Sequence, residues 1–291
     1  MKRVVIGYIF CDRKPGKDEE AFLKEAEKRN IEIVMFNLCK KTTEKEVEKK
    51  ARRCKIIFNN SAEDYAPEFV KTLEALGKRV IDSSRACYYN EDKWMFFLEC
   101  KKNKIPTPNT IFLPEDINAA KQELKEFNHW PVILKRVFGT QGEFVDKADN
   151  PEQAEKIIEK FWRKGSERAP IIAQELIRSP CYRIMTIDKE IVQTALKKNR
   201  GWKSTGVYAK KIEKFRIGKK LKKIVDKISD TVHIKVCGID LLKRNNKWYV
   251  LEVNSAPAFD FFEEEREMLI GKVLDLLLKE VKNHHHVKHH Q

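Results

Sequence analysis

Acidic and amide side chains end two consecutive apolar segments near the C-terminus of this 291-residue chain. Asp240 lies in the first segment, and Glu252 and Asn254 end the second. Residues two apart on a strand share a face, so Glu252 and Asn254 point the same way. Buried carboxylates are costly unless they are paired or bound to a metal, and oxygen ligands of this kind suit Mg2+. These three residues therefore predict a metal site, with solvent-facing strand ends as the alternative.

Asp240 can join the other two residues only if it lies opposite Glu252 in an antiparallel hairpin, because directly opposed residues share a face. This register leaves an odd number of residues between the two, which requires an odd-length turn around Asn246 or a bulge. A regular two-residue turn would place Asp240 opposite Leu251 and on the wrong face. We predict the odd-length turn.

Two further segments have residues suited to a nucleotide. Lys135 precedes Gly139-Thr140-Gln141-Gly142, where glycines allow backbone N–H groups close to phosphate and the lysine adds a positive charge. Short glycine turns also join ordinary hairpins, so this reading stays open, and the segment is not a Walker loop. Downstream, an apolar strand ends in residues whose backbone and acidic side chain could read an adenine and its sugar, namely Gln174-Glu175-Leu176-Ile177.

The elements that would position these residues alternate regularly in the first part of the chain. Apolar runs separated by helical patterns predict a small parallel sheet with helices on both faces. We expect strands at residues 4–10, 31–36, 55–59 and 80–82 and helices at 18–29, 43–54 and 65–76. Later we expect helices at 92–103, 117–127, 151–164, 219–234 and 262–281, and strands at 110–113, 130–137, 171–177, 182–187, 237–243 and 248–254.

Taken in order, these segments resemble the ATP-grasp superfamily, and most closely its RimK-like glutamate ligases. Val137–Gly142 and Leu251–Pro257 are similar to that family's glycine loop and metal strand. The resemblance implies an α/β chain, α+β in its ATP-binding part, in which a small parallel-sheet N-terminal lobe precedes a two-lobed ATP-grasp fold. The implied lobes are residues 1–90, 91–178 and 179–282, followed by a flexible histidine-rich tail at 283–291.

The resemblance also implies a role for each candidate residue. ATP and Mg2+, with Mn2+ as the alternative ion, would be the cofactors. Arg183 and Lys203 would act near the reacting phosphate or substrate, together with Arg200. The metal would be held by Asp240, Glu252 and Asn254. The nucleotide would be held by Lys93, Lys135, Gly139, Thr140, Gln141, Gly142, Gln174, Glu175, Leu176, Ile177 and Lys197.

The activity that the resemblance implies is ATP-dependent joining of a carboxylate to an amine through an acyl phosphate, with release of ADP and phosphate. An amino acid such as glutamate would be added to a protein, peptide or small molecule. Lys203-Ser204-Thr205-Gly206 departs from the family's Arg-Ser-Asn triplet and glycine pair, and Cys181 replaces an expected acid. These departures motivate one alternative, an ATP-binding regulator without catalysis. A basic RNA-binding protein is the other.

Composition bounds the partners and the compartment. The net charge of +15 favours acidic partners such as nucleotides, an acidic peptide or RNA. A helix with lysines along its outer face is either a solvated surface or a dock for an acidic or ribosomal partner, and it carries Lys219, Lys220, Lys222, Lys223 and Lys227.

Seven scattered cysteines without a Cys-x-x-Cys pair argue against a zinc ribbon or a disulfide scaffold, and predict small buried side chains. No apolar run reaches the roughly 20 residues of a membrane span, and the N-terminus does not resemble a signal peptide. We therefore expect a cytoplasmic protein without membrane partners. A homo-oligomer is left open.

Overall fold

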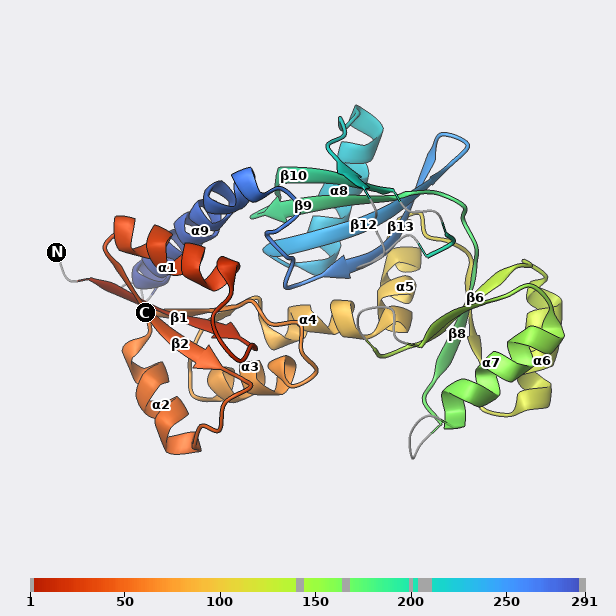
Figure 1. Cartoon of the computed structure of the whole chain (residues 1–291), viewed down its shortest axis with the longest axis horizontal. Coiled ribbons are helices and arrows are strands. Elements are labelled where there is room, and N and C mark those ends of the chain that lie inside the picture. The colour runs from red at the N-terminus through yellow and green to blue at the C-terminus, as the bar shows by residue number, and fades with distance from the viewer. Residues whose placement is uncertain (1–2, 140–143, 164–167, 199–200, 204–210, 288–291) are drawn as a thin grey trace.

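The computed structural model describes residues 3–139, 144–163, 168–198, 201–203 and 211–287 (Figure 1). Within these ranges the strands form three sheets, one parallel and two antiparallel. This mixture confirms the predicted fold class, an α/β N-terminal part followed by an α+β part.

The first sheet is parallel and has the strand order β2-β1-β3-β4. Buried side chains on its two faces belong to two separate cores, because helices cover both sides. α1 and α9 cover one face, and α2 and α3 cover the other. The elements are β1 (Val4–Phe10), α1 (Lys17–Lys28), β2 (Ile31–Asn37), α2 (Glu44–Arg53), β3 (Ile56–Asn59), α3 (Ala66–Ala75), β4 (Val80–Ile81) and α9 (Arg266–Val287).

The last helix, α9, packs against the first part of the chain (Figure 1). Its apolar residues Leu269, Val273 and Leu277 share one core with Phe22 of α1 and Ile6 of β1. Its backbone stays helical to Val287, so the beginning of the predicted tail continues the helix, and residues 288–291 lie outside the described residues. The predicted division into lobes stays a prediction.

Cysteine chemistry differs from the expectation at one place. Cys11 and Cys39, which follow β1 and β2, form a disulfide bond. Their spacing of 28 residues gives no sign of this, because only the parallel pairing of β1 with β2 brings the two strand ends together. The expectation of small buried side chains holds for the free cysteines Cys54, Cys87, Cys100, Cys181 and Cys237.

The central sheet is antiparallel with the order β5-β8-β6-β7. Two amphipathic helices cover one face with a compact apolar core, which leaves the opposite face for polar side chains. Asp116 begins the first of these helices by accepting hydrogen bonds from two backbone N–H groups. The elements are β5 (Thr110–Leu113), α6 (Ile117–Phe127), β6 (Val132–Arg136), β7 (Val145–Ala148), α7 (Pro151–Arg163) and β8 (Ile171–Glu175).

The C-terminal sheet has the order β11-β10-β9-β12-β13, and helices α5 and α8 pack against one face. Three of these elements were not predicted, namely α4, β10 and β11. The elements are α4 (Ser84–Glu91), α5 (Lys93–Lys102), β9 (Cys181–Ile187), β10 (Glu190–Lys198), β11 (Lys211–Glu213), α8 (Lys219–Val232), β12 (Val236–Arg244) and β13 (Lys247–Asn254).

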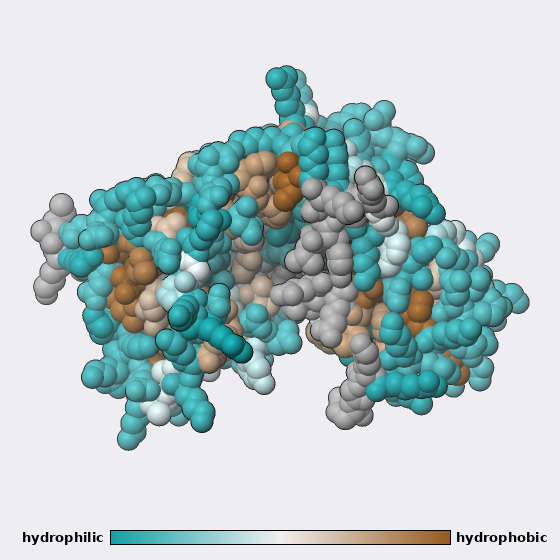
Figure 2. Space-filling model, in the orientation of Figure 1, coloured by the Kyte–Doolittle hydropathy of each residue, from teal (hydrophilic) through white to brown (hydrophobic). Residues whose placement is uncertain are grey.

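The visible surface is mostly hydrophilic, and hydrophobic residues show only in separate small patches (Figure 2). Among the helices in the described ranges, none has the length and apolar character to cross a membrane.

Candidate active site

The β12–β13 hairpin places Asp240 directly opposite Glu252, as predicted. The way it does so differs from the prediction. The turn has two residues, Asn245 and Asn246, both with positive φ, which is the conformation that matches the twist of a hairpin. An irregularity after Asp240 leaves Leu251 without an opposite residue. This β-bulge supplies the odd residue that the register requires.

The bulge also changes the face of the sheet on which the side chains of β13 after Leu251 lie. Val250 lies in the core beneath α8, and so does Val253, three residues later. Without an extra residue, Glu252 would share the buried apolar face of Val250. With the bulge, Glu252 and Asn254 lie on the other face, opposite Asp240 and Gly238.

Asp240 is surrounded by positive charge. Its side chain is 2% exposed. It accepts from Arg183 at 2.9 Å, from Lys197 at 3.3 Å and from the thiol of Cys181 at 3.3 Å. Burial opposes ionisation, but Arg183 and Lys197 outweigh it and lower the pKa of Asp240. A buried, ionised carboxylate is therefore ready at this position.

Glu252 completes an acidic pair. Burial, followed by the charge of Asp240, raises the pKa of Glu252, while Lys135 and Lys93 oppose that rise. Burial in turn lowers the pKa of Lys135 to about 8, and lowers the pKa of Lys93 as well. Two carboxylates and several basic groups are thus held largely away from bulk water. The charge of an added phosphate or metal ion would interact strongly with them there, because water screens it little.

Lys135, Lys93 and Glu252 line one narrow cavity of about 320 Å3, including space open to solvent. It lies where the central sheet meets the C-terminal sheet. Several residues that line this cavity were not predicted from the sequence, because apolar and hydroxyl side chains at these positions carry no chemical signature. The missed residues are Phe96, Phe97, Thr107, Ile172, Val250 and Leu251.

The glycine loop is tied to the start of α5. Asp92 begins this helix by accepting from the N–H of Met95. Lys93 then donates from Nζ to the carbonyl oxygen of Gly139 at 2.6 Å. The predicted loop residues Thr140, Gln141 and Gly142 lie outside the described residues.

At the end of β8, the residues predicted to contact the nucleotide also make contacts within the protein. Gln174 accepts from Lys135 Nζ at 2.8 Å and so orients this lysine. The Glu175 carboxylate is bound by Arg244 at 3.1 and 3.2 Å, and its N–H donates to the carbonyl of Asn109. The side chain of Glu175 therefore holds the central sheet to the β12–β13 hairpin. Next to it, Leu176 is half-buried and Ile177 is buried.

Arg183 occupies a space that only glycine leaves open. A Cβ atom at Gly238 would lie 2.5 Å from the guanidinium carbon of Arg183. Within the described residues, the buried Nε of Arg183 has no hydrogen-bond partner. One donor of this arginine is therefore available to an anion. Of the two other predicted basic residues, Lys203 lies 5.3 Å from the ring of Trp202, and Arg200 is outside the described residues.

The candidate ligand atoms fit a divalent ion whose remaining coordination positions are filled by other ligands. Across residues 3–287, apart from the gaps given above, no cluster of three or more His, Cys, Asp or Glu side chains could hold a metal alone. The predicted set has two carboxylates and the amide of Asn254, whose nitrogen donates to Gly238 at 3.4 Å and leaves its oxygen as the acceptor. Mg2+ usually keeps waters and takes phosphate oxygens as further ligands. The ligand role of these residues stays a prediction.

Comparisons with solved structures agree with this architecture. A RimK-domain ATP-grasp protein from Sphaerobacter thermophilus superposes with a TM-score of 0.75 at 14% identity, covering 92% of this chain and 98% of that one. The D-alanine–D-alanine ligase of Bacillus anthracis gives a TM-score of 0.73 at 15% identity, covering 96% and 98%. These likenesses confirm the fold.

Sequence relatives give the family. The coenzyme gamma-F420-2:alpha-L-glutamate ligase of Methanocaldococcus jannaschii is 26% identical over 223 residues, which are 75% of this chain and 76% of that protein. A probable alpha-L-glutamate ligase of Legionella pneumophila is 26% identical over 226 residues, 75% and 73% of the two chains. The RimK-like ATP-grasp domain model matches residues 90–276. Family membership implies use of ATP, typically with a divalent metal. Because the match spans more than half of the chain, the protein belongs to the RimK-like ATP-grasp family and is an ADP-forming carbon–nitrogen ligase.

Proposed function

We propose that the chain activates a carboxylate with Mg-ATP as an acyl phosphate and joins it to an amine. The observation that carries this proposal is the acidic pair of buried Asp240 and half-buried Glu252, with Lys93, Lys135 and Arg183 around it. Phosphoryl transfer depends on positioning and charge neutralisation more than on covalent help from the protein, and this site supplies both.

Each group has a role in the proposed reaction. Asp240, Glu252 and Asn254 would hold Mg2+, or Mn2+, which would neutralise phosphate charge. Lys135 and Lys93 would bind phosphate oxygens. With a substrate bound, Arg183 and Lys197 would turn from Asp240 to the transferred group, and Lys203 would come from the neighbouring loop. The nucleotide base would lie against the hinge at residues 174–177.

The bond changes balance in two steps. A carboxylate oxygen attacks the γ-phosphorus, the bond to the β-phosphate oxygen breaks, and ADP leaves. The amine nitrogen then attacks the acyl carbon, the carbon–oxygen bond to phosphate breaks, and one proton leaves the nitrogen. Basic side chains and backbone donors stabilise the charge that develops in both steps. The names of the sequence relatives make glutamate the first amino acid to test, and a protein, peptide or small molecule would be the other reactant.

The test is ADP release from Mg-ATP in the presence of glutamate and a nucleotide-depleted cell extract. We expect release by the wild type, loss of release after metal chelation, and recovery when Mg2+ is restored. Hydroxylamine should trap the activated carboxylate as a hydroxamate. Lys135→Met should weaken Mg-ATP binding by about tenfold or more, since it removes a buried charge partner of the phosphates. Lys156→Met, an exposed lysine on α7, is the control. Hydroxamate formation without ATP would refute the proposal.

A further inference from the structure

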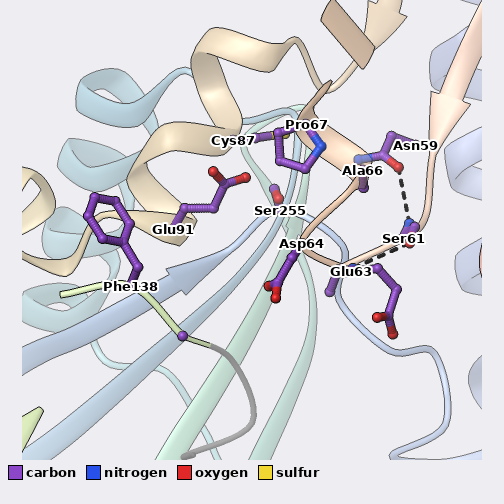
Figure 3. Close-up of a pocket in the computed structure, with 12 residues that line it drawn as sticks. Asn59, Ser61, Glu63, Asp64, Ala66, Pro67, Cys87, Glu91, Phe138 and Ser255 are labelled. Atoms are coloured by element: carbon purple, nitrogen blue, oxygen red, sulfur yellow. Dashed lines mark hydrogen bonds between the residues drawn. The ribbon is translucent and has the colours of Figure 1, made fainter. Parts of the chain in front are cut away.

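Two further cavities differ in the charge of their linings. Glu63, Asp64 and Glu91 line the cavity between the first sheet and the glycine loop, which is therefore acidic (Figure 3). The other cavity is an open groove of about 1070 Å3, including space open to solvent, beside the segment that joins α5 to β5. We call it the basic groove, and the lining residues that matter here are Phe97, Lys101, Lys104, Phe127 and His129.

The basic groove has no negatively charged side chain in its lining, within the part of the chain that the structure describes. Lys101 and Lys104 line it, and no aspartate, glutamate or arginine does so. Phe97 lies one helical turn before Lys101, so α5 presents a ring and an ammonium group to the same side. The groove is thus suited to an anion that also has an aromatic part.

Aromatic rings also line the basic groove. Phe127 and His129 are stacked, with their ring centroids 4.5 Å apart. The side-chain nitrogen of Asn109 lies 3.2 Å from Nε2 of His129 and helps to fix this ring. Stacking on such rings is favourable for every nucleobase, because each base has a π face. Rings beside lysines therefore favour a polynucleotide over an acidic peptide, whose carboxylates pair best with the planar guanidinium of arginine.

Exposed lysines extend from the basic groove over the outer sides of α5 and α8, which pack beside each other on the C-terminal sheet. Lys102 pairs with Glu99 at 3.5 Å, and Lys222 pairs with Asp226 at 2.8 Å. The other lysines of this set have no ion-pair partner among the described residues. The whole set is Lys101, Lys102, Lys104, Lys219, Lys220, Lys222, Lys223 and Lys227.

This lack of partners is not general in the molecule. On α1, Lys24 and Lys28 each contact Glu267 of α9, at 2.5 and 3.2 Å. Asp230, the last acid of α8, is bound by Lys189 of the neighbouring turn. Three lysines without partners recur three and four residues apart on the side of α8 away from its buried residues, and we call them the lysine stripe: Lys220, Lys223 and Lys227. Their charge attracts a polyanion.

We propose that the basic groove and the lysine stripe bind a single-stranded polynucleotide. A base would stack on the rings of Phe127 and His129, and Lys101 and Lys104 would bind the phosphates next to it. The strand would continue over α8, where the lysine stripe contacts phosphates without reading sequence. This binding surface is separate from the ligase site and does not depend on the proposed reaction.

The experiment is titration of the full chain into a fluorescently labelled oligoadenylate of about ten nucleotides, a length within the usual range for such sites. Fluorescence anisotropy measures binding, with RNA and DNA forms in separate arms, and the form that binds more tightly identifies the ligand. We expect binding that weakens with salt. The slope of log affinity against log salt should be about −3 to −4, because each lysine of the groove and stripe contributes about −0.7 on a single strand.

Removal of the lysine stripe should weaken binding by at least about tenfold near 50 mM salt and make the slope shallower by about 2 units. The variant changes three exposed side chains, Lys220→Gln, Lys223→Gln and Lys227→Gln. A matched control removes three exposed lysines in and before α2, and it should change the affinity by no more than about twofold. Its substitutions are Lys41→Gln, Lys45→Gln and Lys49→Gln.

Phe127→Leu separates stacking from charge. Leucine keeps an apolar side chain against the core of the central lobe but removes the aromatic face. We expect binding to weaken by about fivefold or more, the usual effect of losing one stacked base. The salt slope should stay unchanged, because no phosphate contact is lost.

The remaining outcomes overturn the inference. They are the absence of salt-dependent binding to both oligonucleotides, binding that persists when the lysine stripe is removed, and an equal loss in the control, which would reflect net charge alone. Polyglutamate of the same length tests the other occupant. If it displaces the oligonucleotide at an equal or lower concentration, the surface binds an acidic protein and the inference is wrong.

Discussion

Two buried aspartates lie in different regions of the molecule, and different partners compensate each of them for the loss of water. Asp82 follows β4 in the first sheet, and Asp240 lies in β12, and both are 2% exposed. Asp82 accepts hydrogen bonds from the backbone N–H groups of Lys235 and Val236, at 2.7 and 3.0 Å. Burial outweighs these bonds and raises the pKa of Asp82 to about 7.

Asp240 is held instead by the side chains of Arg183 and Lys197, and its pKa is lowered despite burial. Backbone amides are fixed in place, whereas long basic side chains can turn toward another anion. We propose that Asp82 serves structure and that Asp240 remains available for ligands. We expect substitution of Asp82 to affect stability and substitution of Asp240 to affect turnover.

The largest effect should come from Asp240→Asn. Loss of one metal-binding charge should reduce ADP release by about 100-fold or more, comparable with removal of a key electrostatic group in other enzymes. ADP release per folded molecule is the measurement, with Asp226→Asn as the matched control, because Asp226 pairs with Lys222 on the solvent-facing side of α8. If Asp240→Asn releases ADP within a few-fold of the wild-type rate, the proposed difference between Asp82 and Asp240 is wrong.

Asp82→Asn should lower the free energy of unfolding by about 1–3 kcal/mol, the usual cost of a buried donor left without an acceptor. The amide has only one acceptor oxygen, so either Lys235 or Val236 loses its partner. Denaturant unfolding measures the loss. ADP release per folded molecule should match the wild type, and a strong loss of turnover would show that this region also serves the site.

The pH dependence of stability sharpens the same contrast. The folded pKa of Asp82, about 7, lies above the ordinary value near 3.9 expected in the unfolded chain. The folded state then binds more protons between these values, so the free energy of unfolding falls as pH rises through the window. Between pH 6 and 8 the wild type should lose about 1.4 kcal/mol more than Asp82→Asn. Parallel pH curves for the two proteins would contradict this.

The smallest effect is expected from replacing one glycine by alanine in either region, which adds one methyl group. A Cβ at Gly7 would meet Ile57 at 2.8 Å, and one at Gly238 would meet Arg183 at 2.5 Å. Overpacking costs about 1–3 kcal/mol, and the stiffer backbone of alanine returns part of it, so each variant should lose about 1 kcal/mol. Only Gly238→Ala should also impair turnover, because it displaces Arg183. Equal turnover in the two variants would remove Arg183 from the proposed site.

Much of the fold could be predicted from local patterns. Val4–Phe10 and Ile117–Phe127 match the expected strand and helix, because apolar spacing and capping signals are local. Glu190–Lys198 was missed, since its mixture of polar and apolar residues becomes a strand only through pairing with β9. α4 was also missed, although Ser83 caps it.

The candidate site shows the same limit. Residue types alone indicated that Asp240 and Glu252 share a face, and the register confirms it. A bulge was one of the two ways to reach this register, but we predicted the other, an odd-length turn. The position of the bulge at Leu251 could not be foreseen, because the residue is an ordinary leucine. The cavity residues Phe97 and Ile172 carried no motif, and their common cavity exists only through contacts between distant segments.

The return of α9 to the first sheet has a consequence for synthesis on the ribosome. The core around Ile6, Phe22 and Ile31 is completed by Leu269, Val273 and Leu277, residues that are translated long after the first sheet. One face of the first sheet therefore stays uncovered while the central and C-terminal sheets are being made. The nascent first sheet should remain sensitive to protease and attractive to chaperones until α9 leaves the exit tunnel, so that folding of this region waits for translation of α9.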